Sequence, residues 1–188
     1  MNKEYFDDFE VKLEQELLKL SRSFGLLDDQ LLSSDDLNMK WKEIAPDYLS
    51  EAVKQVADYP EFAIGCAAYI GMALAKWWDE DWGKYHGKPF ESLLGSRGFD
   101  NMDDNIMESI LGYSPNSAEG GIISKILLTL SSTAISSIRK ENIGFQTTEM
   151  YHILTRTTMV MFRIGAAIEL KKLGYKLHKV NLGNQLPS

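Results

Sequence analysis

The chain has 188 residues, of which 44% are hydrophobic and 25% are charged, and its formal net charge is −7. These values are typical of one soluble globular domain with its own core, and they exclude a collagenous or intrinsically disordered chain. The single cysteine, Cys66, excludes an intrachain disulfide and a cysteine-based zinc site.

The N-terminal half supplies the first predicted helices. Apolar residues recur at spacings of three and four over residues 3–22, which predicts an amphipathic helix. A second helix is expected to begin at a Ser34 or Asp35 cap. Pro46 is expected to interrupt it and to act as the first-turn residue of a further helical segment over residues 47–58.

Residues 60–85 read PEFAIGCAAYIGMALAKWWDEDWGKY and predict a central helix over about residues 60–82. No charged residue occurs between Phe62 and Ala75, and a helix that is apolar on all sides must be buried on most faces. Gly71, and later Gly165, are expected to mark close helix crossings. The apolar run is too short to span a bilayer, so no membrane segment is expected.

The remaining pattern predicts a loop over 86–98, a helix over 99–111, a second loop over 112–121, and helices over 122–140 and 148–173. Residues 175–188 are expected to form a flexible tail. The sequence therefore predicts an all-α, single-domain bundle of about six helices, spanning residues 1–188 and packed around the central buried helix.

Three tryptophans and three carboxylates meet at the end of the central helix, in the order Trp77, Trp78, Asp79, Glu80, Asp81 and Trp82. Trp78, Trp82 and Tyr85 recur at i, i+4 and i+7 and form an aromatic strip that is typical of core packing. Such a strip can also line a pocket for an apolar or cationic ligand, with Asp79 or Asp81 at its mouth. Alternatively, residues 79–81 can bind a divalent metal, provided that they converge with other carboxylates.

A polar stripe follows the last predicted helix. Glu149, His152, Arg156 and Arg163 fall within an arc of about 60° on that helix. The stripe is either the solvent-facing edge of the helix or the wall of a polar cavity where the arginines pair with carboxylates. One hypothesis is that these arginines face the 79–81 carboxylates. Glu149 and His152 form only one E-x-x-H motif, whereas ferritin-like di-iron bundles carry two, so no metal site is assigned.

Charge is distributed unevenly along the chain, and this limits the kinds of partner that the chain can bind. Residues 1–138 carry 12 Lys and Arg against 24 Asp and Glu, whereas residues 139–188 carry 8 against 3. We expect the basic C-terminal helix to complement acidic neighbours within the chain. The net negative charge argues against nucleic-acid binding, which requires a broad positive face.

No phosphate-binding loop, dinucleotide fingerprint or nucleophile elbow occurs, so no catalytic residue and no cofactor is assigned. The N-terminus contains no apolar signal region, which predicts a cytoplasmic protein. We therefore expect a non-enzymatic helical binding or regulatory protein that contacts a protein, a small molecule or a second copy of itself. One alternative is an enzyme that uses residues 79–81 with His152, Arg156 or Arg163. The other is a pocket lined by Trp77, Trp78, Trp82 and Tyr85.

Overall fold

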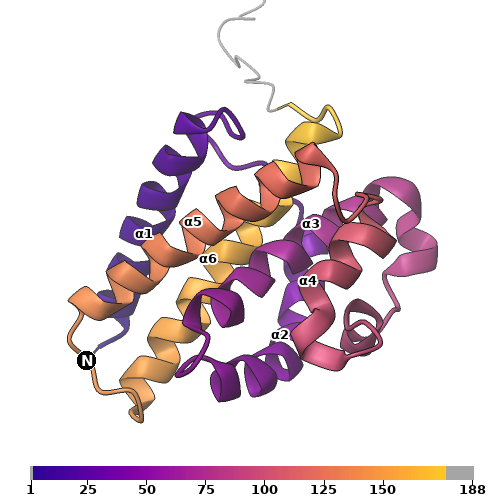
Figure 1. The fold of residues 1–188 in the computed structure, drawn as a ribbon. Coiled ribbons are helices and arrows are strands. Elements are labelled where there is room, and N and C mark those ends of the chain that lie inside the picture. Colours follow the sequence, from indigo (N-terminus) through magenta and orange to yellow (C-terminus); the bar gives the residue numbers. More distant parts are fainter. Residues whose placement is uncertain (1, 177–188) are drawn as a thin grey trace, which may run out of the picture.

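A computed structural model describes residues 2–176, and these residues form an all-α bundle with no strand (Figure 1). The helices are α1 (Lys3–Ser23), α2 (Asp35–Gln55), α3 (Pro60–Tyr85), α4 (Met102–Asn105), α5 (Ala118–Lys140) and α6 (Thr148–Lys172). This confirms the predicted fold class. Most of the expected tail, residues 177–188, lies outside the described residues.

Helix α3 is the centre of the bundle, as its composition predicts. Every residue from Ala63 to Ala75 is buried. Figure 1 shows α3 in the middle of the molecule, with α5 and α6 on one side and α4 on the other. An apolar helix of this kind is stable in water because its neighbours cover all of its faces.

Backbone contact between α3 and α6 requires two glycines. A Cβ atom on Gly71 would lie 2.2 Å from the carbonyl oxygen of Phe162. A Cβ atom on Gly165 would lie 2.0 Å from the carbonyl oxygen of Ala68. No side chain fits at such distances, so both predicted close crossings are confirmed, and they are two sides of the same crossing.

Helix α2 continues through Pro46, so the predicted interruption at this residue is wrong. Proline removes one helical hydrogen bond, but buried side chains on both sides of it hold the two halves in line. Ile44 precedes it and Tyr48 follows it, and both are buried. The Tyr48 hydroxyl also donates a hydrogen bond to the carbonyl oxygen of Ala63 on α3. Tertiary packing therefore overrides the local signal.

The segment predicted as a helix over 99–111 is not a regular α-helix. It begins as a 3-10 turn, Gly98–Asn101, continues as α4 and ends as a π-helical turn, Ile106–Ile110. Phe99, Met102 and Ile106 of this segment are nevertheless buried, and Ile110 is half-buried. The segment therefore packs an apolar face inward, although its hydrogen-bond pattern is not that of a regular α-helix.

Within residues 2–176, one helix, α5, is long and apolar enough to cross a membrane. Core helices of soluble proteins have the same length and composition. In this fold α5 packs against α3 and α1, and Ser131 lies buried where a Cβ atom on Gly65 would come within 2.7 Å of its hydroxyl oxygen.

Candidate functional site

The carboxylates at the end of α3 are separated rather than convergent. The backbone leaves the helical conformation at Asp81 (φ −169°, ψ 85°), whose carboxylate accepts the backbone N–H of Lys84 at 3.1 Å. Asp81 therefore caps the short helical turn that follows. Glu80 pairs with Lys76 at 3.1 Å.

Asp79 has a third and separate contact, because it accepts a hydrogen bond from the Tyr175 hydroxyl at 2.8 Å. All three carboxylates are exposed. Among residues 2–176, no group of three or more His, Cys, Asp or Glu side chains is arranged to hold a metal ion. The convergence that an enzyme based on residues 79–81 requires is therefore not seen in this part of the chain.

The neighbouring aromatic side chains contact other parts of the chain. Trp77 stacks on Tyr85, with ring centroids 5.6 Å apart, and the Lys88 ammonium lies 5.0 Å and 4.9 Å from these two rings. The chain's own lysine thus occupies the position next to the rings where a cationic ligand would be attracted.

The other two tryptophans also have intramolecular partners. The Trp78 indole donates to Asp36 on α2 at 3.0 Å, and its ring packs edge-on against Tyr175. Tyr175, which falls at the start of the expected flexible tail, is thus docked against the end of α3. The ring of Trp82 lies 6.1 Å from that of His86. None of the predicted aromatic residues lines the clefts described below.

The polar stripe of α6 faces α1, not residues 79–81, so the hypothesis that joined those two groups is wrong. Arg156 pairs with Asp7 at 2.7 Å and with Glu10 at 2.5 Å. Arg163 pairs with Glu10 at 2.9 Å and with Glu14 at 3.0 Å. These acids recur every three or four residues along α1, a signal that sequence reasoning did not connect with the arginines.

His152 lies at the exposed end of the same stripe. Its ring centroid is 5.0 Å from that of Phe6, a buried residue of α1. This packing accounts for the position of the imidazole without a ligand. His152, Arg156 and Arg163 are thus brought together by α1, and their partners belong to α1.

A cleft of about 480 Å³ opens beside Arg163, between α1, the loop that joins α1 to α2, the start of α2, and α6. We call it the α1–α6 cleft. Its walls include Glu14 and Leu18 of α1, Leu31 of the loop, Leu37 of α2, and Phe162 of α6. The loop is fixed by exposed ion pairs of Asp29 with Arg22 and of Asp28 with Lys171. A second cleft, of about 420 Å³, lies between this loop and the end of α6.

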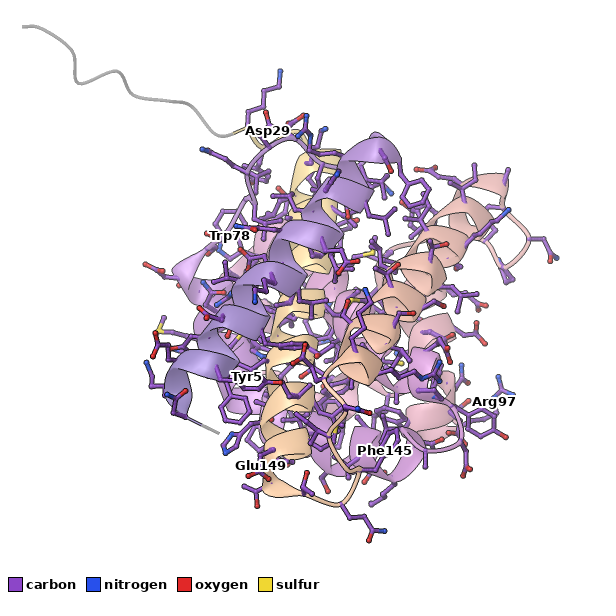
Figure 2. All side chains as sticks on the ribbon, turned by 90° about the vertical axis from the view of Figure 1, so that its left-hand side faces the viewer. Tyr5, Asp29, Trp78, Arg97, Phe145 and Glu149 are labelled. Carbon is purple, nitrogen blue, oxygen red and sulfur yellow. The ribbon has the colours of Figure 1, made fainter. Side chains whose placement is uncertain are left out.

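An apolar surface lies at the opposite end of α6. Three crevices adjoin there, because the first two share Val56 and Leu154 and the last two share Ile138, Arg139 and Phe145. We call this surface the apolar groove. It is formed by the second half of α2, the start of α3, the end of α5, residues 142–145 and the start of α6. Figure 2 shows Phe145 at one end of the molecule and Asp29, on the α1–α2 loop, at the other.

Large apolar side chains are exposed at this groove. Phe145 is 65% exposed and lines two of the crevices, and Val53 is 44% exposed and lines the third. No periodic pattern in the sequence predicts this surface, because its residues come from four helices and from the loop at residues 142–145.

One buried carboxylate stands apart from these surfaces. Glu169 of α6 is 5% exposed, and its Oε2 atom has no hydrogen-bond partner among the described residues. Burial raises its pKa to about 7, although the nearby Lys76 acts in the opposite direction.

No protein-family model, no curated protein and no solved structure matches this chain.

Proposed function

We propose that this chain is a non-enzymatic, cytoplasmic helical protein that binds a partner protein in its apolar groove. The observation that carries the proposal is that Phe145, which lines two of the adjoining crevices, is 65% exposed and that Val53, which lines the third, is 44% exposed. Exposed apolar surface of this kind is unfavourable in water unless a partner covers it.

The composition of the groove supports this proposal. Tyr, Phe and Arg are enriched at protein interfaces, and hot-spot residues tend to be aromatic or Arg. Arg139 lies between Ile138 and Phe145 on the wall of two crevices and forms no ion pair or side-chain hydrogen bond with another described residue. It is therefore free to pair with a carboxylate at the edge of the partner. The enzyme alternative has less support, because Asp79, Glu80 and Asp81 are exposed and have separate partners.

Affinity capture from cells with three versions of the chain tests this function. The parent is compared with Phe145→Asp, which places a charge in the groove, and with Phe24→Asp. Phe24 is 40% exposed at the end of α1 and is the matched control. Circular dichroism first establishes that both variants fold.

We expect a discrete partner, or a homodimer seen by light scattering, that Phe145→Asp loses and Phe24→Asp keeps. Identical partners for all three versions, or a monomer without a specific partner, would overturn the proposal.

A further inference from the structure

The α1–α6 cleft combines apolar walls with three charged side chains. The half-buried Leu18, Leu31 and Leu32 supply its accessible apolar surface. Glu14 and Arg163 supply opposite charges, and the third charged group, Asp29, pairs with Arg22. Its volume of about 480 Å³ falls within the range of about 300–1,000 Å³ that is usual for small-molecule sites.

Arg163 has hydrogen-bond donors that its ion pairs do not use. Its Nη1 atom donates to both Glu10 and Glu14, and its Nε and Nη2 atoms have no partner among the described residues. The side chain is 33% exposed. Because a guanidinium carries its donors in a rigid fork, this remaining edge fits a planar carboxylate in a bidentate manner.

Glu14 is also only partly engaged. Its Oε2 atom accepts from Arg163, whereas its Oε1 atom has no hydrogen-bond partner among residues 2–176. A lone anion at Arg163 would be repelled by Glu10 and Glu14, and a lone cation at Glu14 would be repelled by Arg163. A ligand that carries an ammonium and a carboxylate on the same carbon atom satisfies both groups at once.

Uncharged polar groups also line the cleft. Ser33, Ser34 and Asn38 line it, and Ser34 is the N-cap residue of α2 but makes no capping hydrogen bond through its side chain. These hydroxyl and amide groups can bond to an ammonium or a carboxylate. Polar and apolar side chains thus line one cleft, which is the pattern of an amphipathic ligand site.

We propose that the α1–α6 cleft binds a free α-amino acid with a large apolar side chain. Its carboxylate meets the Nε and Nη2 edge of Arg163, its ammonium meets Glu14, and its side chain packs against Leu18, Leu31 and Leu32. This site is separate from the apolar groove and does not depend on the function proposed for the groove.

Calorimetric titration of the full chain tests the class of ligand. The probes are L-leucine, L-phenylalanine, L-alanine, 2-phenylethylamine and 3-phenylpropanoate, each at millimolar concentration. We expect L-phenylalanine or L-leucine to bind. L-alanine and the two single-charge analogues should have a Kd at least about tenfold higher, or should not bind. Intrinsic fluorescence gives a second readout, because Trp41 stacks on Phe162 with a centroid distance of 4.6 Å. No binding of either large apolar amino acid would overturn the proposal, as would equal binding of the single-charge analogues.

Two variants test the geometry. Leu31→Trp fills the cleft and leaves its charges in place, so it should abolish binding while the chain stays folded. Arg163→Lys keeps the positive charge but removes the fork, so it should weaken binding by about tenfold. Arg139→Lys, in the apolar groove, is the matched control and should bind like the parent. Unchanged affinity in Leu31→Trp and Arg163→Lys would place the ligand elsewhere and refute the site.

Discussion

Replacing Gly165 with alanine should destabilise the fold, although alanine is the better helix former. The new Cβ atom would lie 2.0 Å from the carbonyl oxygen and 2.6 Å from the carbonyl carbon of Ala68, whereas ordinary contact begins at 3.4 Å. Helices α3 and α6 would therefore have to separate by about 1.4 Å. The obstacle is backbone, so no change of rotamer can relieve it.

The magnitude follows from two opposing effects. Overpacking of this kind costs about 3 kcal/mol, at the upper end of the usual range, because the whole α3–α6 interface must move. The higher helix propensity of alanine stabilises the variant by about 1 kcal/mol relative to glycine. The net loss of about 2 kcal/mol corresponds to a fall in Tm of about 4–8 °C for a chain of this size.

Urea unfolding followed by circular dichroism and tryptophan fluorescence measures this loss. Gly121→Ala is the matched control, because Gly121 lies in α5 and a Cβ atom there would meet nothing within 4 Å. That variant should gain about 0.5–1 kcal/mol. If Gly165→Ala unfolds at the same urea concentration as the parent, or a higher one, the backbone contact between α3 and α6 is refuted.

Three further predictions concern other groups. The native pKa of Glu169, about 7, exceeds its ordinary value of 4.5, so the native state holds the extra proton and stability falls as pH rises between these values. Glu169→Gln should remove this dependence of stability on pH and raise the free energy of unfolding at pH 8, measured in urea, by about 3 kcal/mol. An unchanged pH dependence would contradict the reasoning. If Asp81 acts as a cap, Asp81→Ala should lower the free energy of unfolding by about 1 kcal/mol, whereas Asp81→Asn should leave it almost unchanged. Equal losses of stability in the two variants would exclude that role. Burial raises the pKa of the Cys66 thiol, so a disulfide reagent should label Cys66 only after unfolding, and rapid labelling of the native chain would show that it is accessible.

The central part of the fold could be predicted from the sequence because its signals are local. The apolar stretch from Phe62 to Ala75 indicates burial on all faces, and Ala63–Ala75 is buried throughout. Gly71 and Gly165 indicate close approach because each is a glycine within an otherwise strong helical pattern. Such signals depend on composition and periodicity along one helix, and no knowledge of its neighbours is needed.

Features that depend on a neighbour could not be predicted in the same way. Pro46 reads as a helix breaker until the burial of the residues on both sides of it is known. One hypothesis placed Arg156 and Arg163 against the carboxylates of residues 79–81, but acidic residues lie on α1 as well, and only the packing of α1 against α6 decides between them. The three adjacent carboxylates of residues 79–81 indicate a candidate site in the sequence. In the structure Asp81 instead caps the turn that follows a kink in α3.

The two proposed surfaces share α6, and this determines how their effects combine. Leu154 lies in the apolar groove and Phe162 in the α1–α6 cleft, and eight residues of helix separate them by about 12 Å. Between residue 162 and residue 166, α6 touches the backbone of α3 at Gly71, with no flexible side chain between them. A helix held in this way does not slide easily, so a ligand in the cleft has little means of altering the groove. Substitutions at the two surfaces should then act independently, as expected for sites more than about 10 Å apart that share no partner. Loss of the partner protein in Phe145→Asp and loss of the amino acid in Leu31→Trp can therefore each be attributed to its own surface.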